Sequence, residues 1–85
     1  MAHLFVNLNV GSYRKWKTSF EESSQALGEA GCIGSQVFRS GDDPTQVFLL
    51  LEWDELERAR QFVQSPQRDD ILQGENQAHY FMSEV

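Results

Sequence analysis

The residue types that can move a proton or hydrogen-bond an oxygen lie mainly near the two ends of the chain. Asn7 and Asn9 share one face of an alternating apolar stretch, and His79 and Tyr80 are neighbours near the C-terminus. Asparagine is depleted in strands, and such departures from local preference often mark functional positions. A histidine can act as a base near neutral pH. We therefore interpret Asn7, His79 and Tyr80 as candidate catalytic residues.

Each candidate also has a purely structural interpretation. Asn7 and Asn9 would also suit a polar, hydrated centre of a subunit interface. A single histidine in a strand is usually just hydrogen-bonded or exposed. Successive strand side chains point to opposite faces, so His79 and Tyr80 can line one cavity only if a bulge separates them. Catalysis therefore requires an enclosed cavity that contains at least one of the three candidates.

The hydrophobic pattern predicts the elements that must position these residues. Strict alternation and turn signals predict strands over residues 4–10, 33–40, 46–53 and 78–84. A long helix is expected over residues 13–30, with Ser12 as its cap and Gly31 as its terminator.

A second helix is expected to begin after Asp54, which forms a capping box with Glu57, and to end before Pro66. Pro66 is also expected to start a short third helix that continues to Leu72. The resulting order predicts an α+β, ferredoxin-like βαββαβ fold, a four-stranded antiparallel sheet with the helices on one face. We expect one domain over residues 1–85.

The apolar stripe of the first helix has a gap in its middle turn. The stripe consists of Tyr13, Trp16, Phe20 and Leu27. The gap is filled by Ser23 and Ser24, which favours a space between helix and sheet that Tyr80 would also line. Alternatively, the serines allow close approach or lie off the stripe. Our candidate substrate pocket comprises Trp16, Phe20, Ser23, Ser24 and Trp53.

Trp53 has a structural interpretation as well. It stands where the third strand gives way to a charged helical segment. A large aromatic residue at such a junction is usually part of the core. We expect Trp53 to close the end of a central strand and to pack under the start of the second helix.

The strand over residues 46–53 is apolar on both faces, which is typical of a strand buried on both sides. Two helices can cover only one face of the sheet. Phe48 and Leu50, together with Phe5 and Phe38, would then form a large exposed apolar patch. We therefore predict a homodimer joined through the sheet face.

Composition excludes several other classes of protein. The chain has 85 residues and a net charge of −6, and its seven Lys and Arg residues are scattered, which argues against a nucleic-acid partner. The longest apolar run, residues 47–51, falls far short of the roughly 20 residues of a membrane span. Cys32 is the only cysteine, so no internal disulfide or zinc cluster is expected. With no secretory signal, we expect a cytoplasmic protein.

Three segments carry a resemblance to a known family: "SYRKWKTSFEE", "GSQVFRSGDDPTQVFLLLEWDELERARQFVQSP" and "YFMSEV". Together they cover nearly the whole chain and resemble small antibiotic-biosynthesis-monooxygenase-like proteins of the dimeric α+β barrel superfamily. The resemblance implies this fold and a dimer. Members include cofactor-independent oxygenases of aromatic polyketides, haem-degrading enzymes, polyketide cyclases and many proteins of no known activity.

An oxygenase of this kind must favour the anion of an electron-rich aromatic substrate inside a dry, apolar cavity. Residues of suitable type are Asn7, Asn9, Trp16, Arg39, Trp53, His79 and Tyr80. Some members use an asparagine on the first strand, which supports Asn7. Haem-degrading relatives place their ligand histidine on a helix, and the second and third helices here contain none, so we expect no haem.

Two functions remain open at this stage. The first is a monooxygenase or cyclase that acts on a small aromatic or polyketide-type molecule without metal, flavin or other cofactor. The second is a non-catalytic dimer that binds a small ligand or serves as an interaction module.

Overall fold

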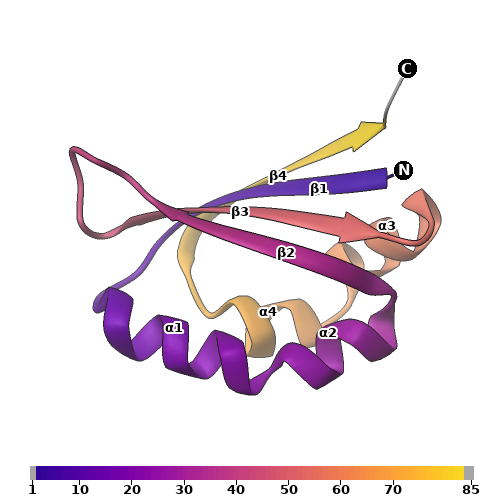
Figure 1. The fold of residues 1–85 in the computed structure, drawn as a ribbon, viewed down its shortest axis with the longest axis horizontal. Helices are drawn as coiled ribbons and strands as arrows, with labels where there is room; N and C mark the ends of the chain where they lie inside the picture. Colours follow the sequence, from indigo (N-terminus) through magenta and orange to yellow (C-terminus); the bar gives the residue numbers. More distant parts are fainter. Residues whose placement is uncertain (1, 84–85) are drawn as a thin grey trace.

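A computed structural model describes residues 2–83 and shows strands and helices in the predicted βαββαβ order (Figure 1). The elements are β1 (Ala2–Asn9), α1 (Tyr13–Glu22), α2 (Ser24–Ala30), β2 (Cys32–Arg39), β3 (Gln46–Trp53), α3 (Leu56–Gln64), α4 (Gln67–Leu72) and β4 (Glu75–Ser83). The strands form one sheet in the order β2-β3-β1-β4 with every neighbouring pair antiparallel. The predicted ferredoxin-like α+β fold is therefore confirmed.

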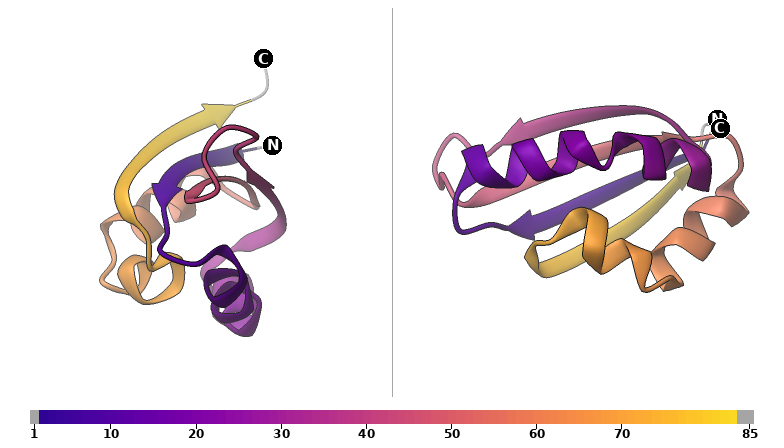
Figure 2. Two further views of the ribbon diagram at one scale, coloured as in Figure 1. Left: turned by 90° about the vertical axis from the view of Figure 1, so that its left-hand side faces the viewer. Right: turned by 90° about the horizontal axis from the view of Figure 1, so that it is seen from below.

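All the helices lie on one side of the sheet, and the opposite side is left open (Figures 1 and 2). The burial of β1 and β3 alternates residue by residue along both strands. The core lies between the sheet and the helices, and its largest fully buried side chains are Leu4, Val6, Leu8, Val47, Leu49, Leu51, Trp53 and Leu72. The period-2 pattern in the sequence thus separates a core side from an open side.

The predicted first helix, residues 13–30, is divided into α1 and α2 at Ser23. The Ser23 hydroxyl donates to the Ser19 carbonyl oxygen at 3.1 Å, and the Ser23 backbone lies outside the helical region at φ −90°, ψ 3°. Serine side chains compete for backbone partners in this way and bend helices. The predicted ends are confirmed: the Ser12 hydroxyl accepts from Lys15 N, and Gly31 ends α2 with φ 117°.

The capping box predicted for the second helix is wrong. Helix α3 begins one residue later than expected, its cap residue is Glu55, and no side chain caps it. Asp54 instead pairs with Arg58 at 2.8 Å, and Arg58 also donates to the Glu29 carbonyl oxygen at 2.8 Å. Arg58 therefore ties α3 to the end of α2, and Asp54 pairs with its guanidinium.

The last strand begins at Glu75, three residues before the predicted start at Ala78. The pairing of β1 with β4 shifts between Asn7 and Asn9, so a bulge admits the additional residues. Two residues in this region have left-handed backbones, Gln73 (φ 57°) and Asn76 (φ 54°). The predicted end of the strand, Glu84, lies outside the described residues.

Candidate functional site

The side of the sheet that faces away from the helices, called the open face below, carries a patch of aromatic side chains. Phe5 lies at its centre, paired with Leu50 on β3 and with Tyr80 on β4. The Phe5 ring centroid lies 6.0 Å from that of Phe48 and 6.1 Å from that of Tyr80. Tyr80 is 55% exposed, and Met82, which pairs with His3 on the same face, is 40% exposed.

Asn7 lies on the open face, beside the aromatic patch. It pairs with Phe48 on one side and Ala78 on the other. Its Oδ1 accepts a hydrogen bond from Gln46 Nε2 at 3.0 Å. This bond fixes the orientation of the amide and leaves Nδ2 as the group that can donate to a ligand.

Asn9 lies apart from the aromatic patch. It lines a polar hollow of about 490 Å³ at the end of the sheet, together with Thr45, Gln73, Glu75 and Asn76. The two strand asparagines, which the sequence places on one face, therefore have different surroundings because of the bulge between them.

Tyr80 and His79 point to opposite faces of the sheet, as predicted. Tyr80, however, does not face the helices, as the predicted pocket beside the first helix required. Its pairing with Phe5 places it on the open face, away from α1. The expectation that Tyr80 lines a space with Trp16 and Phe20 is therefore wrong. Strand alternation alone could not decide this, because the facing depends on the register with β1.

His79 pairs with Val6 and faces the helices. Its Nε2 lies 3.0 Å from Gln77 Oε1. Partial burial lowers the pKa of His79, and the nearby Arg68 guanidinium lowers this pKa further. These surroundings favour a neutral imidazole that Gln77 holds in place.

The helix side has a hollow of about 350 Å³ between α1–α2 and β2, and two of the five predicted pocket residues, Phe20 and Ser24, line it. Trp16 stacks on Phe20 with centroids 5.1 Å apart, and its Nε1 donates to the Leu72 carbonyl oxygen at 2.6 Å. The Ser23 hydroxyl is used within the helix. Trp16 and Ser23 thus contribute to packing and helix geometry rather than to the lining of this hollow.

Trp53 is fully buried and packs on Phe62 of α3 with ring centroids 5.3 Å apart. This confirms that it closes the end of the strand under the following helix. Among the buried side-chain nitrogens and oxygens of residues 2–83, Trp53 Nε1 alone has no hydrogen-bond partner. Trp53 does not line the hollow that Phe20 and Ser24 line.

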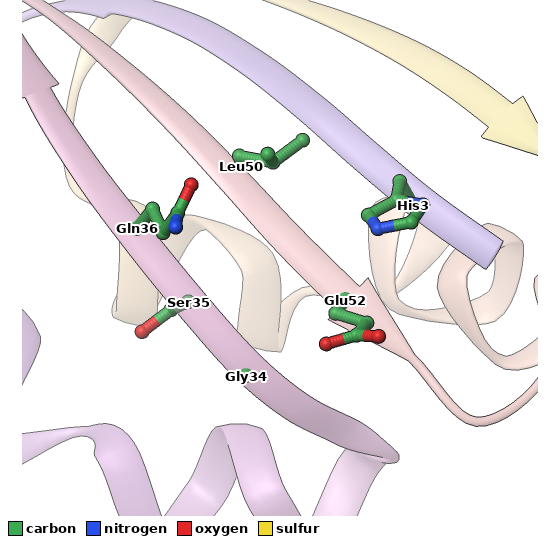
Figure 3. Close-up of a pocket in the computed structure, with 6 residues that line it drawn as sticks. All are labelled: His3, Gly34, Ser35, Gln36, Leu50 and Glu52. Carbon is green, nitrogen blue, oxygen red and sulfur yellow. The ribbon is translucent and has the colours of Figure 1, made fainter. Parts of the chain in front are cut away.

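A further hollow of about 290 Å³ lies on the open face at the end where β1 begins (Figure 3). It is lined by His3, Gly34, Ser35, Gln36, Leu50 and Glu52. His3 and Glu52 lie opposite one another on β1 and β3. Sequence reasoning missed this pair, because a single histidine near the terminus gains meaning only once the register brings Glu52 beside it.

Asn7, His79 and Tyr80 line none of the five most clearly formed hollows on the surface of residues 2–83. Within the same residues, no three His, Cys, Asp or Glu side chains are grouped as a metal site would need. Nor does any helix in this range have both the length and the apolar content to cross a membrane. A cavity that encloses Asn7 and Tyr80 would need a second surface placed over the open face, whereas His79 faces the helices and would lie outside it.

Comparison with known proteins places the chain in a class and then in a family. The fold defines a ferredoxin-like α+β domain, and the family described as antibiotic biosynthesis monooxygenase matches residues 3–84. The chain therefore belongs to the antibiotic biosynthesis monooxygenase family. A search of curated protein sequences gave no match.

Solved structures resemble the whole chain. A proposed antibiotic biosynthesis monooxygenase from Bordetella bronchiseptica is 17% identical with a TM-score of 0.78, covering 99% of this chain and 96% of the other. SnoaB, a cofactor-independent oxygenase from Streptomyces nogalater, is 13% identical with a TM-score of 0.73, covering 99% of this chain and 93% of SnoaB. A proposed antibiotic biosynthesis monooxygenase from Nitrosomonas europaea is 20% identical with a TM-score of 0.61, covering 100% of this chain and 99% of the other. At these identities the likeness establishes the shared fold.

Proposed function

We propose that the chain acts as a homodimer, joined through the open face, that oxidises a small aromatic molecule with molecular oxygen and without metal or flavin. The observation that carries the proposal is the open face itself, where Asn7 and Tyr80 border an exposed aromatic patch centred on Phe5. Family membership and the likeness to SnoaB support the class of reaction.

The dimer follows from the exposure of the patch. Phe38 is 51% exposed and Tyr80 is 55% exposed on a sheet whose other side is packed. Contiguous apolar patches of this kind mark interaction surfaces, and two-fold pairing is the commonest arrangement among oligomers. A second copy stacked on this face would also exclude water from Asn7, Tyr80 and the rings beside them.

The chemistry follows from the polar groups beside the rings. Asn7 Nδ2 and the Tyr80 hydroxyl can donate to the oxygen of a phenol as it ionises, while Phe5 provides an apolar surface for the aromatic ring. The substrate supplies the electrons. One oxygen atom of O₂ enters the oxidised carbon, and the other leaves as water with two hydrogens taken from the substrate.

The first test is native mass spectrometry of the purified protein, which gives the assembly mass and the mass of any retained small molecule. The second is oxygen uptake with an anthrone as probe, compared with its spontaneous oxidation. We expect a dimer, and we expect Asn7→Ala to lower the rate about 100-fold, the scale found for loss of one oxyanion donor. Tyr80→Phe should lower the rate less and leave the assembly mass unchanged.

Asn9→Ala is the matched control, since it changes the same residue type on the same strand outside the patch. Its rate should equal that of the unaltered protein. A monomer at micromolar concentration would overturn the dimer, and equal rates for Asn7→Ala and Asn9→Ala would overturn the role of Asn7.

A second candidate function is a dimer that binds a small ligand without converting it. The observations in its favour are that Asn7, His79 and Tyr80 line none of the five most clearly formed hollows, and that the carbonyl oxygen of Asn7 already accepts from Gln46. A dimer that retains a small molecule in native mass spectrometry yet adds nothing to the spontaneous oxygen uptake would favour this candidate over the enzyme.

A further inference from the structure

We infer that the polar hollow at the end of the sheet binds a neutral sugar through Gln73, Glu75 and Asn76, in the connection from α4 into β4. The ligand is a pyranose ring, free or as part of a glycoside, and the protein recognises its hydroxyl groups. The inference does not depend on the proposed function, because none of the three catalytic candidates lines this hollow. It assigns a binding site and adds no chemical step.

The hollow is formed where three connections of the fold meet. Asn9, the last residue of β1, pairs with Gln46 at the start of β3 and with Glu75 at the start of β4. These three strand ends lie at the same end of the sheet (Figure 1). The Val10 backbone N–H donates to the Thr45 carbonyl oxygen at 2.7 Å, which joins the β1–α1 and β2–β3 connections. The space of about 490 Å³ lies within the range of small-molecule pockets.

The connection from α4 into β4 is held in place by packing and hydrogen bonds. Gly74 lies so close to the fully buried Leu8 that a Cβ at this position would overlap the Leu8 side chain. Just before the connection, Trp16 Nε1 donates to the Leu72 carbonyl oxygen at 2.6 Å. Gln77 Nε2 donates to the Gly74 carbonyl oxygen at 2.9 Å. A segment fixed in this way loses little conformational entropy on binding a ligand, which favours affinity.

Two residues of this connection have left-handed backbones, which glycine adopts most easily. Gln73 (φ 57°) follows the last residue of α4, and Asn76 (φ 54°) lies in β4 where the register with β1 shifts. Neither position carries glycine, so each side chain adds something that the backbone does not require. Left-handed residues other than glycine are uncommon, and such strain clusters at ligand-binding sites.

The charge of the lining indicates a neutral ligand rather than an ion. Among the described residues that line the hollow, Glu75 alone is charged, and its carboxylate would repel an anion. A divalent metal ion would find a single carboxylate there, and its affinity depends on the number of charged ligands. A neutral molecule with several hydroxyl groups meets neither difficulty.

The hydrogen-bonding groups of the lining match the hydroxyl groups of a sugar. A hydroxyl group both donates and accepts, a carboxylate accepts, and an amide side chain does both. Gln73 Nε2 already donates to the Asp70 carbonyl oxygen at 2.9 Å, which orients the amide and leaves Oε1 to accept from the ligand. Glu75 can accept from a hydroxyl, and Asn76 can donate and accept. Val10, which also lines the hollow, offers apolar surface to the C–H groups of the ring.

The test uses the full chain and follows its backbone amide signals by NMR as a sugar is added. The probes are methyl β-D-glucopyranoside, methyl β-D-galactopyranoside and methyl α-D-mannopyranoside. Tetrahydropyran, the same ring without hydroxyl groups, is the matched control ligand. We expect at least one glycoside to shift the signals of residues 73–76 in a saturable way. Tetrahydropyran should leave these signals unchanged, and the signals of Phe5 and Leu50 on the open face should not respond to any probe.

Two variants remove the proposed contacts one at a time. Glu75→Gln keeps the size of the side chain and removes its charge, and it should raise the dissociation constant at least about tenfold, the value of one hydrogen bond to a charged group. Asn76→Gly removes the amide side chain but keeps a residue that adopts the left-handed backbone, and it should raise the dissociation constant about fivefold. Glu22→Gln is the matched control, since Glu22 is exposed on α1 and does not line the hollow.

Saturable shifts in residues 73–76 that weaken in Glu75→Gln and Asn76→Gly but not in Glu22→Gln support the site. The site is overturned if none of the three glycosides shifts these signals, or if tetrahydropyran shifts them equally. It is also overturned if the dissociation constant is the same in Glu75→Gln as in the unaltered protein. The spectra report whether each variant is folded, so Glu75→Gln decides alone if Asn76→Gly does not fold.

Discussion

Strand β3 carries apolar residues on both of its sides, but the two sides have different roles. Val47, Leu49 and Leu51 face the helices and are fully buried, whereas Phe48 and Leu50 face the other way and remain partly exposed. A shift of one residue along the strand separates the two environments. The comparison shows that apolar residues in one strand can be divided between holding the chain folded and joining it to another molecule.

The largest expected effect is loss of the dimer after a substitution on the open face. Phe48→Glu places a charge beside Phe5, and two-fold symmetry would repeat the change in both copies. Burial of one phenylalanine contributes about 1.5–3 kcal/mol, so the dimer dissociation constant should rise at least about 100-fold. Analytical ultracentrifugation would measure it. Phe81→Glu, on the opposite side of the sheet, should leave the assembly intact, and a dimer that survives Phe48→Glu would contradict the proposed interface.

The next largest expected effect is loss of folding stability after a substitution on the helix side of β3. Leu49→Ala removes a fully buried side chain and should lower the free energy of unfolding by about 2–5 kcal/mol. Leu50→Ala, the same change one residue along, should cost less than about 1 kcal/mol when measured in the Phe48→Glu background, where association does not contribute. Urea denaturation would compare them. Equal losses in the free energy of unfolding would mean that the two sides of β3 contribute alike to the stability of the fold, which would contradict separate roles in folding and assembly.

A smaller effect is expected within the core, where Trp16 Nε1 has a hydrogen-bond partner and Trp53 Nε1 has none among residues 2–83. Trp16→Phe removes the partner of the buried Leu72 carbonyl and should cost about 1–3 kcal/mol beyond the change in ring size. Trp53→Phe removes an N–H that has no partner within residues 2–83 and should carry no such additional cost. Chemical denaturation would give both values, and a larger loss for Trp53→Phe would contradict this account.

The smallest expected effect concerns His79, on the helix side of β4. Because the folded chain lowers the pKa of His79 below 6.5, the unfolded chain binds this proton more readily. Stability should therefore decrease as the pH falls through and below 6.5. His79→Gln should make the stability curve flatter in this window and leave it unchanged at higher pH. A steeper slope in the variant would reverse the sign and contradict the assignment.

Much of the fold could be predicted from local patterns, and the errors arose from a side-chain hydrogen bond within one helix and from pairing between distant strands. Alternating apolar residues gave β1 and β3, and Gly31 correctly ended a helix. The division at Ser23 depends on a side-chain hydrogen bond that competes with the helix. The start of β4 depends on a bulge opposite Asn7 and Asn9, which no local pattern encodes.

The candidate site was harder to predict because it depends on register. Residue type singled out Tyr80, but only its pairing with Phe5 placed it on the open face and away from Trp16. His3 had no distinguishing neighbour in sequence, and its partner Glu52 became visible only through the alignment of β1 with β3. Residue chemistry can therefore be read from a single sequence, whereas the grouping of residues requires knowledge of the strand pairing.

The position of β1 in the middle of the sheet has a consequence for synthesis of the protein. Ala2 pairs with Trp53 on one side and with Ser83 on the other, so β1 requires one partner from the middle of the sequence and another from β4, the last strand of the sheet in sequence order. Such long-range pairing folds slowly and leaves apolar strand surface exposed in the meantime. The complete sheet can form only after β4 has been translated and has emerged from the exit tunnel, and until then β1 lacks one of its two neighbouring strands.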